Sequence, residues 1–205
     1  MSHSSNGIYA LLQSPRVYAG LQKLLARKDA RRVIADEYIR SQSGDRVVDI
    51  GCGPGTMLPY LGAVHYTGFD LNQTYIKWAE KAYKGRGSFF QCRVEDAEKR
   101  LESEVNIVIA IAVLHHLDDA EARALIATAY RILRPGGRLI TFNAVFTSPQ
   151  NLIARMLIRL DRGKSVRTEQ GYRNLAADCF ERIKIDIRTD LLRLPYTHCI
   201  TVCTK

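Results

Sequence analysis

From residue 46 onward, short apolar runs alternate with stretches in which apolar residues recur at helical spacing. The first run, Arg46 to Ile50 (RVVDI), is rich in β-branched residues and is followed at once by a glycine, which is typical of a buried parallel strand. Further runs predict strands at residues 65–70, 88–94, 105–113 and 138–145. Because strands and helices alternate, we expect a mostly parallel sheet with helices on both faces.

The best-defined helix lies between the last two of these strands. Asp118 and Glu121 have the spacing of a capping box, and apolar residues follow at helical spacing on one face. Pro135-Gly136-Gly137 is a stop signal for that helix. We therefore expect the helix to end before Pro135 and the next strand to begin at Arg138.

The two ends of the chain depart from this alternation. Residues 15–40, 151–160 and 170–180 have helical spacing, and two β-like runs joined by a short connection close the chain as an antiparallel pair. The pattern predicts a Rossmann-like, doubly wound α/β fold whose seven-stranded sheet is mostly parallel, with the last strand antiparallel.

Length and composition are those of one domain with an appended cap. The 205 residues are 46% apolar and 25% charged, as in ordinary globular proteins. We expect an N-terminal helical cap at residues 1–45 and a domain at residues 46–205, with an insertion at about 147–175. The start, MSHSSN, lacks the apolar stretch of a signal peptide, and the longest apolar run is too short to span a bilayer. We therefore expect a cytoplasmic protein without a membrane span.

The cysteine content and the charge further narrow the possible classes of protein. The five cysteines are odd in number and lack CxxC spacing, which argues against a disulfide framework and a zinc site. The net charge of +9 is concentrated at the two ends of the chain, whereas residues 46–145 are nearly neutral. A basic surface attracts nucleic acid, anionic lipid or an acidic small substrate, and it also serves solubility alone.

The chemistry is concentrated where the first predicted strand ends, in the sequence VVDIGCGPG of residues 47–55. A glycine turn between a buried strand and a helix lets the backbone approach a ligand at the carboxyl edge of the sheet. Asp70 follows Gly51 by 19 positions and ends the second strand. An acid at that place can hold two ribose hydroxyls.

A nicotinamide dinucleotide fold is the main alternative for this turn. It requires GxGxxG, with pyrophosphate at the helix N-terminus, but here the sixth position is Thr56. Asp49 lies two residues before the first glycine, where its carboxylate would repel pyrophosphate and attract the α-ammonium of a bound amino acid. The pattern favours a cationic adenosyl amino acid.

Three motifs occur in order, namely DIGCGPG at residues 49–55, FDLN at 69–72 and LRPGGRL at 133–139. On these motifs the chain resembles the class I S-adenosylmethionine-dependent methyltransferases, over roughly residues 44–145. The later DRGKSVR and LPYTHCI segments look like those of a bacterial subgroup that acts on small molecules. The resemblance implies an enzyme that uses S-adenosylmethionine and releases S-adenosylhomocysteine.

The resemblance also implies contacts to each part of this cofactor. These are Asp49, Gly51, Cys52 and Gly53 at the methionine end, Asp70 at the ribose, Leu71 at the adenine, and Ala110 and Val113 beside the sulfonium. The family often places an acid after the third strand for the adenine amine, and here that stretch reads CRVED. The residue facing adenine is therefore Arg93 or Val94, and the acid is Asp96 or absent.

His115 and His116 follow the fourth strand, close to the expected position of the methyl group. Methyl transfer is an in-line displacement, so alignment supplies much of the rate and a base is needed only for a protonated acceptor. Imidazole can take the proton of an attacking hydroxyl, although such a pair can also serve only to bond backbone. We therefore expect O-methylation of a small molecule, with His115 or His116 as the candidate base.

Three alternatives are weighed against this function. Metal-assisted O-methylation is not favoured, because Asp118 and Asp119 are explained as a helix cap, and no metal is expected. An RNA methyltransferase would suit the basic ends, but neither an RNA-binding module nor an aromatic platform is evident, and the Asn/Asp-Pro-Pro-aromatic signature of nucleic-acid amino methyltransferases is replaced by AIAVLHH. A protein that binds the cofactor without transferring methyl groups is the third.

The acceptor pocket is expected in the segments outside the shared scaffold. Candidate lining residues are Tyr9, Tyr18, Asn143, Arg155, Arg162, Arg167 and Tyr172, of which the aromatic ones can equally pack in the core. Arg155, Arg159 and Arg162 recur at spacings of four and three. If they line the pocket, the acceptor is anionic; otherwise they form a solvated helix face.

Overall fold

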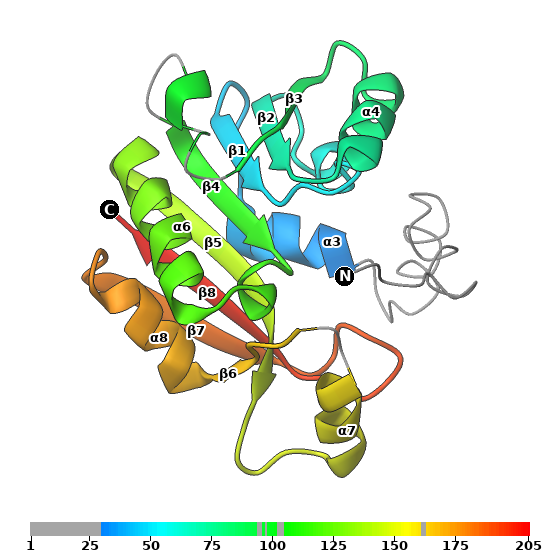
Figure 1. Cartoon of the computed structure of the whole chain (residues 1–205), viewed down its shortest axis with the longest axis vertical. Coiled ribbons are helices and arrows are strands. Elements are labelled where there is room, and N and C mark those ends of the chain that lie inside the picture. The colour runs from blue at the N-terminus through cyan, green and yellow to red at the C-terminus, as the bar shows by residue number, and fades with distance from the viewer. Residues whose placement is uncertain (1–29, 94–95, 97, 102–104, 161–162) are drawn as a thin grey trace, which may run out of the picture.

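The computed structural model describes residues 30–93, 96, 98–101, 105–160 and 163–205. Within these residues the strands form one eight-stranded sheet (Figure 1). The strands are β1 (Arg46–Ile50), β2 (His65–Asp70), β3 (Gly87–Gln91), β4 (Val105–Ile111), β5 (Leu133–Phe146), β6 (Arg167–Thr168), β7 (Arg182–Arg188) and β8 (His198–Thr204). The helices are α3 (Ala30–Val33), η1 (Ile34–Ile39), η2 (Leu58–Tyr60), α4 (Gln73–Ala82), η3 (Glu98–Arg100), η4 (Leu114–His116), α6 (Asp119–Ile132), α7 (Leu152–Leu160) and α8 (Glu169–Ala177).

The sheet has the strand order β3-β2-β1-β4-β5-β8-β7, and the two-residue β6, which was not predicted, pairs with the end of β5. The strands from β3 to β5 are parallel, whereas β8 is antiparallel to both β5 and β7. This topology confirms the predicted Rossmann-like sheet. Chain order reverses between β1 and β4, and ligands bind at the carboxyl ends of the strands at such a point.

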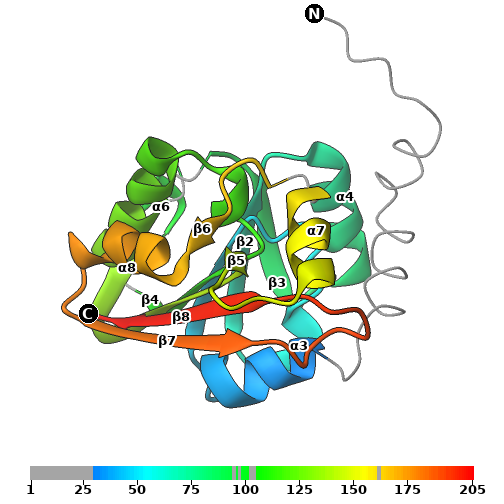
Figure 2. The same cartoon turned by 90° about the horizontal axis from the view of Figure 1, so that it is seen from below.

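Two apolar clusters cover the two faces of the sheet. Buried side chains of α6 and α8, such as Leu125 and Leu175, pack on one face. Buried side chains of η1 and α4, such as Ile39 and Ile76, pack on the other. Figure 2 shows the sheet between α6 and α8 on one side and α3 on the other. α7 lies beyond the carboxyl end of β5, outside both layers (Figure 1).

The boundary between α6 and β5 differs from the prediction. The predicted capping box of α6 is present, but β5 begins at Leu133 rather than at Arg138. Gly136 adopts a φ of +75°, and the pairing of β5 with β4 shifts register in this region. The Pro-Gly-Gly segment ends the helix as expected, and it then forms the irregular first part of a longer strand because glycine permits that backbone conformation.

Two arginines hold η1 on the sheet. Arg138 donates to the carbonyl oxygens of Tyr38 (3.1 Å) and Ile39 (2.6 Å), and Arg188 donates to the Glu37 carboxylate (2.6 Å) and the Tyr38 hydroxyl (2.9 Å). The rest of the predicted cap, residues 1–29, lies outside the described residues, so the domain boundary at residue 45 stays a prediction. No helix in the described part of the chain is long and apolar enough to cross a membrane.

Candidate functional site

The glycine turn after β1 brings the backbone to the crevice between β1 and β4. The backbone N–H groups of Gly51 and Cys52 donate to the carbonyl oxygen of Phe69 at 2.7 and 3.0 Å, which ties the turn to β2. Gly51 and Gly53 have φ values of +73° and +54°. A Cβ on Gly51 would lie 2.5 Å from Cγ2 of Val113, whereas a Cβ on Gly53 would meet no atom within 4 Å. Gly51 thus permits close packing of the turn, and Gly53 borders open space that a ligand can fill.

The Asp70 carboxylate connects this turn with the end of β2. Its Oδ2 accepts from the backbone N–H of Gly53 at 2.8 Å, and its Oδ1 accepts from that of Asn72 at 2.7 Å. Each carboxylate oxygen has a second lone pair, so both can still accept from hydroxyl groups of a ligand. Leu71 follows directly, and its apolar side chain is 65% exposed.

Asp49 is a buried carboxylate at the end of β1. Its exposed fraction is 2%, and its Oδ2 accepts from the Tyr66 hydroxyl at 2.7 Å. Its Oδ1 has no hydrogen-bond partner among the described residues. Burial raises the pKa of Asp49 from 3.8 to about 7, opposed by the hydrogen bond from Tyr66 and reinforced by the charge of Asp70. A buried carboxylate with one unpaired oxygen is suited to binding a cation.

The end of β3 offers a polar side chain that sequence reasoning missed. Gln91 pairs with Asp70 in the sheet, and its Nε2 donates to the carbonyl oxygen of Leu71 at 3.1 Å. Arg93 is exposed, and the Asp96 carboxylate binds Lys99 at 2.9 Å, which lowers the pKa of Asp96. Val94 lies outside the described residues. Gln91 ends a strand next to the one that ends in Asp70, and this position was the signal that could have identified it.

The segment after β4 completes the crevice opposite the glycine turn. Ala110 is fully buried, and Val113 packs against Gly51. Between them Ala112 has a φ of +59°, and its N–H donates to the carbonyl oxygen of Phe142 at 2.7 Å. A left-handed conformation is strained for a non-glycine residue and is often kept at functional sites. Sequence reasoning did not single out Ala112, because nothing in its residue type shows the conformation.

The next turn, η4, holds the two histidines in different environments. His115 is 5% exposed, and its Nδ1 lies 3.2 Å from Oδ1 of Asn143 on β5. An amide oxygen can only accept, so Nδ1 carries the proton and Nε2 of the neutral ring carries the lone pair. His116 is exposed, with its ring centroid 4.2 Å from that of His115. The structure thus brings together His115 and Asn143, which lie 28 positions apart in the sequence.

The segment that follows α7 closes over His115. A Cβ on Gly163 would lie 2.5 Å from Cδ2 of His115, and the backbone N–H of Ser165 donates to the carbonyl oxygen of His115 at 3.0 Å. Asn143 is 1% exposed, and its Nδ2 has no hydrogen-bond partner among the described residues. A buried amide donor beside a buried imidazole gives this end of the crevice the ability to bind a polar atom of a ligand.

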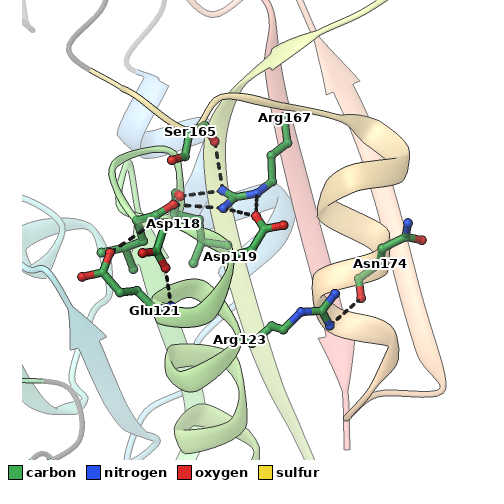
Figure 3. Close-up of polar contacts among 9 residues, drawn as sticks. Asp118, Asp119, Glu121, Arg123, Ser165, Arg167 and Asn174 are labelled. Carbon is green, nitrogen blue, oxygen red and sulfur yellow. Dashed lines mark hydrogen bonds and ion pairs between the residues drawn. The ribbon is translucent and has the colours of Figure 1, made fainter.

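Arg167 binds this segment to η4, the turn of His115 and His116, which we call the histidine turn (Figure 3). Its guanidinium donates to the carbonyl oxygens of Leu114, Leu117 and Ser165, each at 2.9 Å, and binds the Asp119 carboxylate at 2.6 Å. The side chain is 10% exposed. The placement of Arg167 in the acceptor pocket was therefore wrong, since its donors are used to hold backbone.

The other residues predicted to line the acceptor pocket fall into three groups. The Tyr172 hydroxyl donates to the carbonyl oxygen of Ala144 at 2.7 Å and its side chain is buried, so it packs in the core. Arg155 is exposed on α7, with its guanidinium carbon 5.8 Å from the ring centroid of Phe146. Tyr9, Tyr18 and Arg162 lie outside the described residues.

We expect Arg167→Ala to lower the free energy of unfolding by about 1–3 kcal/mol, because it leaves three partly buried carbonyl groups without their charged donor. Arg123→Ala is the matched control. Arg123 binds the carbonyl oxygen of Asn174 (Figure 3) and the Asp178 carboxylate at the surface, so it should contribute only about 0–1 kcal/mol. Urea denaturation of both variants measures the difference. Equal losses would contradict a special role of Arg167 in holding the turn.

No group of three or more His, Cys, Asp or Glu side chains that could hold a metal ion occurs among the described residues. The five cysteines are free thiols. Two pairs of polar side chains lie at the carboxyl edge beside the turns, namely Asp49 and Asp70 beside the glycine turn and His115 and Asn143 beside η4. The first suits a ligand with a cation and hydroxyl groups, and the second suits the handling of a proton.

Comparison with known proteins gives one family. The family model described as "Methyltransferase domain" matches residues 48–141. The chain is 29% identical over 136 residues to a probable fatty acid methyltransferase of Mycobacterium tuberculosis, covering 64% of this chain and 31% of that protein. It is 25% identical over 114 residues to the ubiquinone biosynthesis O-methyltransferase of Pseudomonas savastanoi, covering 53% and 47%. It is 29% identical over 143 residues to the tRNA 5-carboxymethoxyuridine methyltransferase of Escherichia coli, covering 65% and 53%.

The chain thus spans about half the length, or less, of these curated relatives. Among solved structures, magnesium protoporphyrin IX methyltransferase from Synechocystis has a TM-score of 0.63 at 19% identity. The match covers 100% of this chain and 90% of that one. At this identity the likeness concerns the fold, and that fold is the one described above.

Proposed function

Because the chain belongs to the class I S-adenosylmethionine-dependent methyltransferases, we propose that it transfers a methyl group from S-adenosylmethionine to a hydroxyl group of a small molecule. The observation that carries the proposal is that Asp70 accepts from the backbone N–H of Gly53, which borders open space, while the buried Asp49 keeps one carboxylate oxygen without a partner among the described residues. An adenosyl amino acid carries a cation and two ribose hydroxyls. Its site must therefore offer a carboxylate for the cation, acceptors for the hydroxyls and a backbone that the ligand can approach closely.

In this proposal different residues contact each part of the cofactor. Asp49 binds the α-ammonium through its unpaired Oδ1, Gly51, Cys52 and Gly53 border the methionine end, and Asp70 accepts from the ribose hydroxyls. Leu71 packs on adenine, with Gln91 and Arg93 near the same edge, while Ala110 and Val113 border the sulfonium. When bound, S-adenosylmethionine supplies a methyl carbon activated by the positive sulfur.

The histidine turn provides the acceptor half of the chemistry. His115 takes the proton of the acceptor hydroxyl on Nε2 as the oxygen attacks, and Asn143 stabilises the required tautomer by accepting from Nδ1–H. Arg167 acts on this step only as a positioning residue, through the carbonyl groups on both sides of His115. Burial beneath Gly163 and Ser165 excludes water from the ring.

Calorimetry with S-adenosylmethionine, S-adenosylhomocysteine and NAD tests the proposal. We expect the two adenosyl amino acids to bind and NAD not to bind, because pyrophosphate would approach the Asp49 carboxylate. Transfer of a labelled methyl group from S-adenosylmethionine to hydroxyl-bearing metabolites, with Escherichia coli tRNA as a parallel acceptor, then tests the acceptor class. Folded protein that binds neither adenosyl compound would rule the proposal out.

The raised pKa of Asp49 predicts a pH dependence of cofactor binding. The α-ammonium requires the carboxylate form, so affinity for S-adenosylhomocysteine should rise with pH and level off above about 7. Below that value it should fall by up to roughly tenfold per pH unit. Calorimetry at pH 5.5, 6.5 and 7.5 measures the change, and Asp49→Asn should bind weakly with little pH dependence.

The same pKa has the opposite effect on the stability of the protein without cofactor. Between about pH 4 and pH 7 the folded state holds a proton on Asp49 that the unfolded state has released. The free energy of unfolding should therefore decrease as pH rises through this window, relative to Asp49→Asn.

The binding prediction has its own contrary outcome. If the wild-type protein binds S-adenosylhomocysteine equally well at pH 5.5 and 7.5, Asp49 does not bind the ammonium.

The second candidate function is methyl transfer to RNA. It is supported by the similarity to the Escherichia coli tRNA methyltransferase and by the net charge of +9. A cofactor-binding protein without methyl transfer is the third, and labelled-methyl transfer distinguishes it from the other two. The proposal places the protein in the bacterial cytoplasm, where its five free thiols would stay reduced. It includes no metal ion.

A further inference from the structure

The Tyr66 side chain on β2 reaches from the interior of the sheet to the Asp49 carboxylate at the end of β1. Tyr66 is 3% exposed, and its hydroxyl donates to Oδ2 of Asp49 at 2.7 Å. In the sheet Tyr66 pairs with Val47, whereas Asp49 pairs with Gly68. The ring therefore extends over two residues of the strands, about 6.6 Å, toward the carboxyl edge.

Two glycines leave room for this ring. Gly87 pairs with Tyr66 on β3, and a Cβ there would lie 2.9 Å from Cδ1 of Tyr66. Gly68 lies on the same face of the sheet as Tyr66, beside Asp49, and carries no side chain that could block the ring. The ring of Phe89 packs against Tyr66 with the two centroids 5.5 Å apart. Because the ring is buried and packed on β3, its hydroxyl has a fixed position.

The contact gives the two oxygens of Asp49 different roles. Oδ2 accepts from the Tyr66 hydroxyl, while the buried Oδ1 has no hydrogen-bond partner among the described residues. A carboxylate that is held at one oxygen presents the other in one direction. An acceptor oriented before the ligand arrives binds a donor more tightly than one that must first be ordered.

The same contact affects the charge of Asp49. Among the described residues, the titratable groups that interact with Asp49 are the Tyr66 hydroxyl, the Asp70 carboxylate and the Cys52 thiol. Burial and the charge of Asp70 raise the pKa of Asp49, whereas the hydrogen bond from Tyr66 lowers it. Burial raises the pKa of Tyr66 and of Cys52, so the hydroxyl remains a donor and the thiol remains neutral. Of these three groups, Tyr66 alone favours the carboxylate form that an ammonium requires.

We propose that Tyr66 is a positioning residue for the cofactor, which orients the Asp49 carboxylate toward the α-ammonium and so makes the site selective for ligands that carry this ammonium. The proposal rests on the proposed function, because that function supplies the ammonium. Tyr66 acts only through Asp49. Its loss should therefore affect binding of the amino acid end of the ligand and leave binding of the adenosine end unchanged.

Calorimetry of Tyr66→Phe with two ligands tests the proposal. S-adenosylhomocysteine carries the ammonium, and 5′-methylthioadenosine has the same adenosine group without it. At pH 7 the variant should bind S-adenosylhomocysteine about five- to tenfold more weakly than the wild type and bind 5′-methylthioadenosine equally well. The pH at which the affinity for S-adenosylhomocysteine levels off should rise by about one unit, so the difference between the two proteins should narrow at pH 8.5.

Two further variants make the test specific. Tyr83→Phe is the matched control, because the half-buried Tyr83 is stacked on Phe89 in the same aromatic group, and it should bind both ligands as the wild type does. The double variant Asp49→Asn with Tyr66→Phe should bind S-adenosylhomocysteine as Asp49→Asn alone does. A positioning effect that acts through Asp49 has nothing left to act on in that protein.

Nuclear magnetic resonance on the full chain without ligand tests the contact independently of any cofactor. With ¹³C at the carboxyl carbons and at Cζ of tyrosine, the Asp49 and Tyr66 signals of the wild type should change together near pH 7. Asp49→Asn identifies the carboxyl signal. In Tyr66→Phe the Asp49 signal should titrate at higher pH. The wild-type signals decide the matter even if a variant does not fold.

The proposal is overturned if Tyr66→Phe binds S-adenosylhomocysteine with the affinity and pH profile of the wild type, or if it weakens both ligands equally. It is also overturned if the Asp49 and Tyr66 signals titrate independently. Wild-type protein that binds neither ligand would count against the proposed function, while the ¹³C titration would still report on the contact. Wild-type binding of S-adenosylhomocysteine with an unchanged profile in Tyr66→Phe would count against this inference alone.

Discussion

Replacing Asp70 with alanine is expected to weaken the binding of S-adenosylhomocysteine by about 2–4 kcal/mol. The loss exceeds that of one hydrogen bond to a ligand because the carboxylate serves two purposes. It accepts from the backbone N–H groups of Gly53 and Asn72, and in the proposed complex it also accepts from the ribose hydroxyls. Removing it both deletes the ribose partner and frees the glycine turn that borders the methionine end.

Isothermal titration calorimetry of three proteins separates these two contributions. Asp70→Asn keeps one accepting oxygen, so it should hold part of the turn and lose less affinity than Asp70→Ala. Asp178→Asn is the control for a general loss of negative charge, because Asp178 lies at the surface beside Arg123 at the end of α8. If Asp70→Ala binds as tightly as Asp178→Asn, the cofactor does not lie along β2 as proposed.

The fold was largely predictable because its signals are local. The apolar runs that became β1 and β2 were predicted with the observed bounds, and the capping box marked the start of α6 correctly. The signals failed where tertiary pairing decides the structure. Nothing in the Pro-Gly-Gly segment alone indicates that β4 pairs with Leu133 before the irregularity, and a two-residue strand such as β6 has too few residues to show a period.

The candidate site was predictable where a motif lies within one turn and obscure where the partners are distant in the sequence. The glycine turn and Asp70 followed from spacing, and the structure joins them by a hydrogen bond from Gly53. Arg167 shows the limit of this reasoning. Its residue type in a variable segment suggested a ligand contact, but backbone carbonyl groups some fifty positions away use its donors. Carbonyl groups carry no sequence signal, so only the folded chain reveals this.

The largest effect is expected for His115→Ala, which should lower the turnover of a hydroxyl acceptor by about 10²–10⁴ while leaving the affinity for S-adenosylhomocysteine unchanged. His115 is buried, Asn143 determines its tautomer, and the turn is held by Arg167, so its ring is fixed in one orientation. His116 is exposed, and its replacement by alanine should change turnover only slightly. Single-turnover kinetics with labelled S-adenosylmethionine and the acceptor found in the transfer assay measure both variants.

Asn143→Asp then distinguishes a base from a side chain that only packs. A carboxylate at this position accepts from Nδ1–H as the amide does, but it also stabilises the imidazolium form, so it raises the pKa of His115. If the neutral imidazole is the base, turnover is lost as pH falls through that pKa, and the acidic limb of the pH profile should move to higher pH in Asn143→Asp. With S-adenosylmethionine saturating at each pH, the limb should disappear in His115→Ala, leaving the slow residual reaction with little pH dependence in this range. Equal small losses in the His115 and His116 variants, with an unmoved acidic limb in Asn143→Asp, would assign the pair to packing, and the acceptor would then have to lose its proton to water.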